Sequence, residues 1–242
     1  MSRERERVQK AFMTTEAYFD QYAAEYDTLM QRSLALAGED KSYFARGRIE
    51  FLARHLRAME FAAKSIMDFG CGTGTAIPLL KEIFQPGALL GVDVSGKSLE
   101  IGRKCFGQHG DFQLIADREP AGDIDLTYVS SVFHHILPRE RPAAFEHILR
   151  SLRPGGIFAF WEHNPWNPGT LHAMSRCPFD DDAITISPFE ARSLLSRAGF
   201  KVLRTDFLFI FPHALAPLRP IEPFFSRFPI GAQYQVLCRK PV

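Results

Sequence analysis

Apolar residues are concentrated in short runs that recur along most of the chain, with longer amphipathic stretches between them. Runs of this length, bounded by glycine, proline or charged residues, predict buried β-strands, and the stretches between them have the length of helices. The expected strands occupy residues 65–70, 88–93, 111–116, 124–130, 156–163, 201–211 and 233–239. The alternation of the first five with helical stretches is the βαβ rhythm of a parallel sheet, and it predicts an α/β protein with a doubly wound fold.

Helical spacing is clearest at three places. Residues 8–62 carry aromatic and aliphatic side chains at three- and four-residue intervals, which predicts helices ahead of the sheet. The stretch 141–152 begins beside two prolines and ends at a Pro-Gly-Gly turn. The stretch 187–198 begins with an N-cap serine, a first-turn proline and an acid at the third helical position, so its boundaries are well defined.

Two segments interrupt this pattern. Residues 164–183 follow the fifth strand, and residues 212–232 are rich in proline, which argues against a regular helix or a central strand there. Both are expected at the carboxyl edge of the sheet, where ligands bind in such folds. We interpret the chain as a single domain in which residues 1–62 form an N-terminal helical cap and residues 63–242 form a core with these two insertions.

Composition narrows the classes of function. With 242 residues and 46% hydrophobic content, the chain can bury one full core. Its 29 basic and 28 acidic residues leave a net charge of +1, so there is no basic field to attract a nucleic acid. We therefore expect small-molecule chemistry and no nucleic-acid partner.

The cysteines and the start of the chain indicate the compartment. The four cysteines are scattered without C-x-x-C spacing, which argues against a zinc site or a disulfide framework and for a reducing environment: Cys71, Cys105, Cys177 and Cys238. The first residues alternate in charge without an apolar segment, and no apolar run is long enough for a membrane span. We expect a cytoplasmic protein without a membrane partner.

The first strand runs into three alternate glycines, Gly70, Gly72 and Gly74. Glycine permits close approach of a ligand to the backbone and tolerates a positive φ, so the loop is expected to bind a nucleotide-type cofactor. Dinucleotide-binding loops have the spacing G-x-G-x-x-G, which this loop lacks. Asp93 ends the second strand and Asp117 follows the third. An aspartate after a strand is commonly a helix N-cap, but acids at successive strand ends favour a shared ligand.

These residues resemble motif I and the later motifs of the class I S-adenosylmethionine-dependent methyltransferases. The resemblance covers about residues 60–210 and includes residues 125–136 and 152–156. It implies a Rossmann-like sheet of seven strands, mostly parallel with an antiparallel last strand, and S-adenosylmethionine as cofactor with S-adenosylhomocysteine as product. The N-terminal helices and residues 162–168 resemble a bacterial subgroup of small-molecule methyltransferases.

The resemblance also implies cofactor contacts at the strand ends. Asp68 is expected beside the methionine amine, Asp93 at the ribose hydroxyls and Asp117 at the adenine amine. The carbonyl of Val129 or Ser130 is expected near the sulfonium. The cofactor-binding residues implied in the core are Asp68, Gly70, Gly72, Gly74, Asp93, Val94, Ala116, Asp117 and Ser130.

Two residues of the cap complete the expected cofactor site. Tyr22 and Arg46 can close on the methionine carboxylate, Arg46 through charge-assisted hydrogen bonds. The alternative for the tyrosine is that it packs on the core from an amphipathic helix.

Four residues at the carboxyl ends of the fourth and fifth strands are candidates for a general base: His134, His135, Glu162 and His163. A base is needed only when the acceptor atom carries a proton that must leave. The alternative is that these residues are hydrogen-bonded structural groups. Because Glu162 and His163 are neighbours on a strand and are expected to point to opposite faces, we predict no metal site.

The sequence therefore predicts a methyltransferase that acts on oxygen or nitrogen of a small, partly apolar acceptor. One alternative is a non-catalytic, S-adenosylmethionine-binding regulatory protein. A nicotinamide-dependent oxidoreductase is disfavoured, because the loop lacks dinucleotide spacing and the chain has no catalytic Tyr-x-x-x-Lys. The identity of the acceptor and the oligomeric state are left open.

Overall fold

The computed structural model describes residues 38–242 except 178–179 and 181. The strands are β1 (Ser65–Phe69), β2 (Ala88–Asp93), β3 (Asp111–Leu114), β4 (Ile124–Ser130), β5 (Leu152–His163), β6 (Lys201–Leu208) and β7 (Gln233–Arg239). The α-helices are α3 (Lys41–Ala58), α4 (Ile77–Phe84), α5 (Gly96–Phe106), α6 (Arg141–Ser151), α7 (Pro168–Met174), α8 (Pro188–Arg197) and α9 (Glu222–Phe225). Short 3₁₀ helices are η2 (Ile115–Asp117), η3 (Phe133–His135) and η5 (His213–Ile221).

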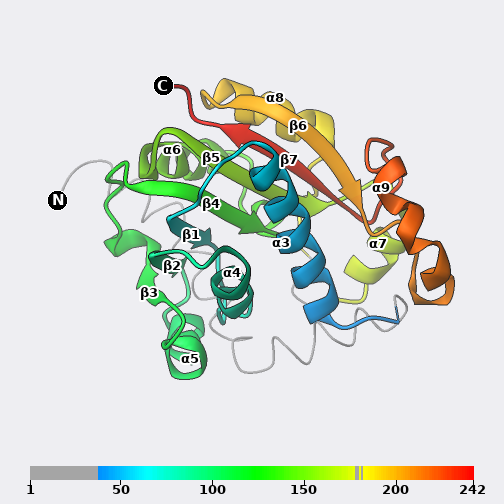
Figure 1. The fold of residues 1–242 in the computed structure, drawn as a ribbon, viewed down its shortest axis with the longest axis horizontal. Helices are drawn as coiled ribbons and strands as arrows, with labels where there is room; N and C mark the ends of the chain where they lie inside the picture. The colour runs from blue at the N-terminus through cyan, green and yellow to red at the C-terminus, as the bar shows by residue number, and fades with distance from the viewer. Residues whose placement is uncertain (1–37, 178–179, 181) are drawn as a thin grey trace.

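The seven strands form one twisted sheet in the order β3-β2-β1-β4-β5-β7-β6 (Figure 1). The strands pair in parallel from β3 to β5, and β7 pairs antiparallel with β5 on one side and with β6 on the other. Strand order reverses at β1, which has β2 on one side and β4 on the other. The predicted doubly wound, Rossmann-like sheet with an antiparallel last strand is confirmed, and the reversal at β1 opens a crevice at its carboxyl end.

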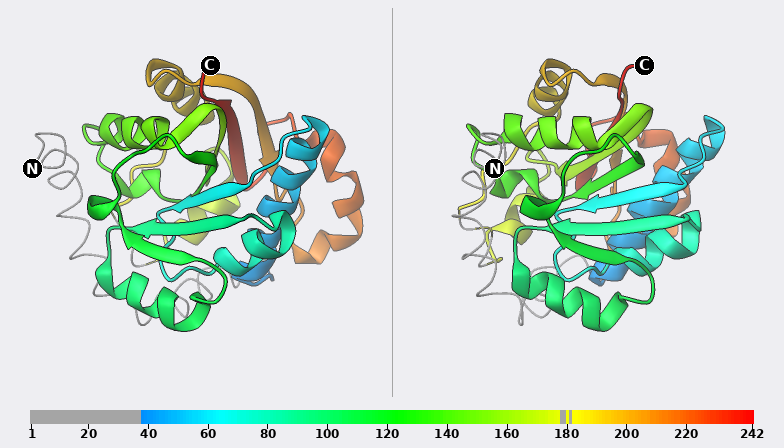
Figure 2. Two further views of the ribbon diagram at one scale, coloured as in Figure 1. Left: turned by 60° about the vertical axis from the view of Figure 1, so that its left-hand side comes forward. Right: turned by 90° about the vertical axis from the view of Figure 1, so that its left-hand side faces the viewer.

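Helices cover both faces of the sheet (Figure 2). On one face α3, α4 and α5 bury a cluster that includes Leu52, Leu80 and Leu99, and on the other α6 and α8 bury a cluster that includes Ile148 and Leu195. Neighbouring residues of β5 alternate between these two clusters, as a strand buried on both faces requires.

The helix 187–198 follows its sequence signals closely. The Ser187 hydroxyl accepts a hydrogen bond from the Glu190 N–H at 3.2 Å, and Pro188 occupies the first turn of α8. Proline is tolerated there because its missing N–H would have no partner inside the helix. The helix ends at Arg197, one residue before the predicted end.

Four strands differ from their predicted bounds, and the first of them, β1, ends at Phe69 rather than at residue 70. β3 ends at Leu114, because the chain turns into η2, and β6 ends at Leu208 rather than at residue 211. β5 begins at Leu152 rather than at residue 156, since Leu152 pairs with Ile124 ahead of an irregularity in the register. This irregularity holds the Pro-Gly-Gly turn that was expected to lie outside the strand.

The proline-rich segment 212–232 is partly helical, which corrects the expectation that it holds no regular helix. Pro217 and Pro220 lie inside the short 3₁₀ helix η5, and Pro223 lies in the first turn of α9. Only a single α-helical turn forms, so the prolines are accommodated where few backbone N–H groups need partners.

Of the predicted N-terminal helices, α3 lies within the described residues and Tyr22 lies outside them. The division into a cap of residues 1–62 and a core therefore stays a prediction. None of the helices in the described part of the chain combines the length and the apolar character that a membrane span needs.

Candidate active site

A cavity of about 200 Å³ lies at the carboxyl ends of β1, β2 and β4, where the strand order reverses. Its walls include Asp68 and the loop after β1, Asp93 and Val94 after β2, Ser130 at the end of β4, and Arg48 from α3. The cavity is therefore assembled at the topological switch point, where doubly wound folds bind nucleotides.

The three glycines of the loop have different surroundings. Their φ angles are +76°, +53° and +79° for Gly70, Gly72 and Gly74, a region that side chains rarely tolerate. A Cβ on Gly70 would lie 2.5 Å from Val132 Cγ2, and one on Gly74 would lie 2.5 Å from Phe112 Cε1. Gly72 has no heavy atom within 4 Å of such a Cβ among the described residues and lines the cavity.

The open space over Gly72 fits a ligand that lies against the backbone. Gly74 is not part of the cavity wall, and packing against Phe112 is enough to require glycine there. Its predicted contact with the cofactor stays a prediction.

Asp93 is held by the loop that it faces. Its two carboxylate oxygens accept hydrogen bonds from the N–H groups of Gly72 at 2.8 Å and Ser95 at 2.9 Å. The carboxylate is thereby oriented on the cavity wall, and carboxylate oxygens are acceptors suited to hydroxyl donors. This arrangement fits the ribose diol that the sequence assigns to Asp93.

Asp68 is a buried acid on the same wall, only 3% exposed. Burial, aided by the negative charge of Asp93 and opposed by Arg48, raises the pKa of its carboxyl to about 7. A cationic group beside Asp68 would favour the ionised form.

The cap residues are arranged differently from the prediction. Arg46 lies on the outer side of α3, where its guanidinium donates to Glu82 of α4 at 2.9 and 3.0 Å, and it is not part of the cavity wall. Arg48 lines the cavity instead, and it donates to the Tyr128 hydroxyl at 3.1 Å and to Gln233 Oε1 at 2.8 Å. The predicted cofactor contact of Arg46 stays a prediction, and Arg48 is a further candidate on the same helix.

Ile115 of η2 is part of the cavity wall beyond the end of β3. Ala116 and Asp117 lie in the same 3₁₀ turn but outside the wall; Asp117 is exposed, and its carbonyl accepts from Gln113 Nε2 at 3.0 Å. Their predicted cofactor contacts stay predictions.

His134 and Glu162 form a buried pair behind the cavity. Glu162 Oε2 lies 2.6 Å from His134 Nδ1, and its other oxygen accepts from the N–H groups of Phe133 at 2.7 Å and Val132 at 3.2 Å. Burial opposes both charges but their attraction outweighs it, so the pKa of Glu162 is lowered to about 2 and that of His134 is raised to about 10.

His135 lines the first cavity, and His163 lines it as well. Burial, with the positive charge of His134, lowers the pKa of His135 to about 3 and that of His163 to about 4. The His163 ring lies 5.1 Å from that of His134. Glu162 and His163 thus both approach His134, but only His163 is part of the cavity walls.

Asp180, which the sequence analysis missed, joins this group from the insertion after β5. Its Oδ1 lies 3.6 Å from His134 Nε2 and 3.4 Å from His135 Nε2. In the sequence it is the first of three consecutive aspartates, a pattern that usually indicates a solvated loop. No local signal distinguishes it from its neighbours.

A second cavity of about 440 Å³ adjoins the first and shares Phe44, His163 and Gln233 with it. Its walls come from the start of α3, from α7, and from the segment between β6 and η5. These elements lie side by side in Figure 1, and an ion pair at 2.7 Å joins Glu39, just ahead of α3, to Arg219 of η5. The two predicted insertions therefore both line this cavity.

The fold and the two cavities define a nucleotide-cofactor enzyme of the doubly wound class with room for a second ligand. A model of the methyltransferase domain family matches residues 67–158. An uncharacterised methyltransferase of Synechocystis is 31% identical over 150 residues, which are 58% of this chain and 68% of that protein. A trans-aconitate 2-methyltransferase of Azoarcus is 33% identical over 120 residues, which are 48% of this chain and 46% of that protein.

A solved structure gives the same result for the fold. The magnesium protoporphyrin IX methyltransferase of Synechocystis, crystallised with bound S-adenosylhomocysteine, superimposes with a TM-score of 0.61 at 15% identity, covering 94% of this chain and 98% of that one. The chain belongs to the class I S-adenosylmethionine-dependent methyltransferases, and its cofactor is S-adenosylmethionine. This excludes the nicotinamide-dependent oxidoreductase and favours an enzyme over a non-catalytic regulatory protein.

Proposed function

We propose that this methyltransferase acts on an oxygen or nitrogen atom of a small, partly apolar acceptor that occupies the second cavity. The observation that carries the proposal is the junction of the two cavities at Phe44, His163 and Gln233. S-adenosylmethionine, when bound, supplies a methyl group on a positively charged sulfur that is already activated for displacement. The protein has chiefly to align the acceptor atom and to exclude water.

The walls of the second cavity support a partly apolar acceptor. Its large apolar side chains come from three different segments: Tyr43, Phe44, Met174, Phe209, Ile210 and Phe211. The charges of Glu39 and Arg219 are paired with each other, and Asn167 offers a polar group among these side chains. A volume of about 440 Å³ suits a small organic molecule.

The cofactor contacts proposed for Asp68, Asp93, Val94 and Ser130 are supported by their places on the wall of the first cavity. Base roles for His135 and His163 also stay proposals, supported by their exposure to that cavity. His134 and Glu162 are 2% and 1% exposed and lie behind these two residues, which favours positioning roles for both.

The decisive experiment changes the second cavity and leaves the first cavity unchanged. Ala173 lines the second cavity and not the first, so Ala173→Leu fills acceptor space without touching the proposed cofactor site. Wild-type protein is incubated with radiolabelled S-adenosylmethionine and a panel of apolar phenols, amines and carboxylic acids, including trans-aconitate because of the named relative. For any acceptor that is methylated, the variant is expected to lower kcat/KM at least about tenfold, equivalent to about 1.4 kcal/mol.

Binding of S-adenosylhomocysteine, measured by calorimetry, is the control and is expected to be unchanged in Ala173→Leu. An acceptor that the variant methylates as well as the wild type would contradict the placement of the acceptor in the second cavity. Methylation of a carrier protein in place of the small molecules would contradict the proposed acceptor class.

A further inference from the structure

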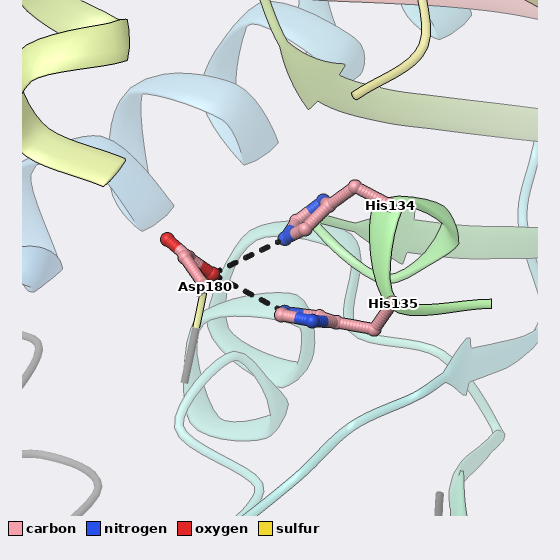
Figure 3. Close-up of side chains that lie close together, drawn as sticks. All are labelled: His134, His135 and Asp180. Carbon is pink, nitrogen blue, oxygen red and sulfur yellow. Dashed lines mark ion pairs between the residues drawn. The ribbon is translucent and has the colours of Figure 1, made fainter. Parts of the chain in front are cut away.

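Three potential metal ligands meet where the two cavities adjoin. Figure 3 shows the rings of His134 and His135 directed toward one carboxylate oxygen of Asp180. The nearest ligand atoms of the three residues all lie within 4.8 Å of one another. Two come from η3 after β4, and the third comes from the insertion after β5.

The separations between Asp180 and the two histidines are those of ion pairs, and they also fit ligands of one shared metal ion. Asp180 Oδ1 lies 3.6 Å from His134 Nε2 and 3.4 Å from His135 Nε2. An N–H···O hydrogen bond spans about 2.7–3.2 Å between heavy atoms. Ligands bound at about 2.0–2.1 Å to one tetrahedral zinc ion lie about 3.4 Å from each other.

Glu162 orients the first of these ligands. Its carboxylate holds His134 Nδ1 at 2.6 Å, which leaves Nε2 facing Asp180. The backbone N–H groups of Val132 and Phe133 fix the other oxygen of Glu162. A metal-binding histidine characteristically donates a hydrogen bond from its other ring N–H to a carboxylate in this way.

The backbone places Asp180 in position. Its N–H donates to the Cys177 carbonyl at 2.9 Å, and its carbonyl accepts from the Ala183 N–H at 3.0 Å. The next residue, Ile184, donates to the His134 carbonyl at 2.8 Å, which ties this segment to η3. The carboxylate is thus held against the two histidines.

We propose that His134, His135 and Asp180 form a binding site for a divalent transition-metal ion of the zinc class. Two imidazoles and one carboxylate suit such an ion better than magnesium or calcium, which prefer oxygen ligands. The two carboxylates of Asp180 and Glu162 balance the charge of a dication. Three protein ligands leave a coordination position open, as in catalytic zinc sites.

The open position lies between the cavities, since His135 lines the first and Asp180 lines the second. The use of this position rests on the proposed function. The oxygen atom of the acceptor would bind there. If that oxygen belongs to a hydroxyl group, the metal would lower the pKa of the hydroxyl, and the proton would pass to solvent. The methyl–sulfur bond then breaks as the methyl–oxygen bond forms, and the sulfur keeps the electron pair. A metal ion at this site would therefore favour acceptors that offer an oxygen atom over acceptors that offer only apolar carbon.

Cobalt(II) titration of the untagged chain tests the site without cofactor or acceptor, because cobalt in such a site absorbs visible light. We expect one cobalt per chain, displaced by zinc. Asp180→Asn is expected to weaken binding at least about 10–100-fold, the loss that follows even from removing a supporting residue of a metal site. Asp182→Asn, a matched change two residues away and outside the cluster, is expected to leave the affinity unchanged.

Circular dichroism and S-adenosylhomocysteine binding establish that each variant is folded. Absence of a cobalt spectrum in folded wild type, or equal weakening by Asp180→Asn and Asp182→Asn, would overturn the site and leave a hydrogen-bonded ionic cluster. Acetate serves as the probe of the open position and is expected to shift the cobalt bands. A spectrum that acetate leaves unchanged would overturn the open position, and none of these outcomes depends on methyl transfer.

Discussion

At the scale of the residue, the glycine loop shows that one motif can combine separate physical requirements. Gly72 lies beneath open space in the cavity wall, whereas Gly70 and Gly74 are required by the side chains of Val132 and Phe112. All three have positive φ, so an alanine at any of them is strained. Substitutions should therefore separate binding from stability.

Gly72→Ala is expected to lower the free energy of unfolding by about 1–2 kcal/mol, the cost of a left-handed residue, and to impair cofactor binding more than stability. Gly74→Ala adds overpacking against Phe112 and should cost about 2–5 kcal/mol in total. Urea unfolding and calorimetric titration with S-adenosylhomocysteine measure the two effects. Phe112→Leu should partly restore the stability of Gly74→Ala and not that of Gly72→Ala. Equal restoration in both would contradict the inference that Gly74 is required by packing against Phe112.

Asp68 makes cofactor affinity depend on pH. The pKa of its carboxyl is about 7, raised by burial and by Asp93 against the opposing charge of Arg48. If the methionine ammonium lies beside Asp68, the ionised carboxylate binds it better. Affinity for S-adenosylhomocysteine should therefore rise about tenfold from about pH 6 to pH 8, as the ionised fraction rises from about one tenth to nine tenths. A flat calorimetric profile in the wild type would contradict the predicted contact.

The stability of the protein without cofactor changes with pH in the opposite direction to the cofactor affinity. The folded-state pKa of Asp68 lies above its ordinary value of 3.8, so the protein without cofactor loses stability as pH rises from about 4 toward 7. Asp68→Asn removes the buried charge. The variant should be more stable than wild type at about pH 8, with a difference that shrinks on acidification, and its cofactor affinity should no longer vary with pH.

At the scale of the element, α3 connects the sheet to both cavities. Arg48 joins this helix to Tyr128 on β4 and to Gln233 on β7, and Phe44 belongs to the walls of both cavities. Arg46 points away from the sheet toward Glu82. Two arginines of one helix thus have different roles.

Arg48→Ala is expected to lower the free energy of unfolding by about 1–3 kcal/mol, because two hydrogen bonds from a charged group are lost. It should also weaken cofactor binding, since Arg48 lines the first cavity. The matched change Arg46→Ala removes only two exposed ion pairs, with Glu50 and Glu82, and should leave both quantities near wild type. Thermal unfolding and calorimetry compare the two; a larger loss of cofactor affinity in Arg46→Ala would restore the original prediction.

The sequence predicts those features of the fold that depend on neighbouring residues along the chain. The Ser187 cap placed α8 within one residue at each end, and the apolar run before Asp93 placed β2 at its observed bounds. Arg48, which lines the cavity, was not singled out because its helix is charged on more than one face and spacing does not say which face packs. Asp180 was missed because its meaning depends on a chain reversal that brings the insertion back onto η3.

At the scale of the whole molecule, the reversal of strand order at β1 brings Asp68, Asp93 and Ser130 from three strands to one cavity. Their carboxyl ends meet because all three strands are parallel. A ligand that contacts them together stabilises the whole fold, since the unfolded chain does not assemble the site.

S-adenosylhomocysteine at 100 times its Kd should raise the free energy of unfolding by about 2.7 kcal/mol, measured by chemical denaturation. NAD at the same concentration should have no effect. Asp93→Ala is expected to remove most of the stabilisation by S-adenosylhomocysteine, because it loses the carboxylate oriented by Gly72 and Ser95. Full stabilisation of that variant would contradict the ribose role of Asp93.

The position of β7 between β5 and β6 has a consequence for synthesis on the ribosome. Residues 157–163 of β5 and the whole of β6 are translated before residues 233–239, which pair with both. Until β7 leaves the exit tunnel, β5 has an open edge on that side and β6 has no partner among the described strands. The nascent chain thus exposes aggregation-prone strand edges late in translation, a period when chaperones would be needed most.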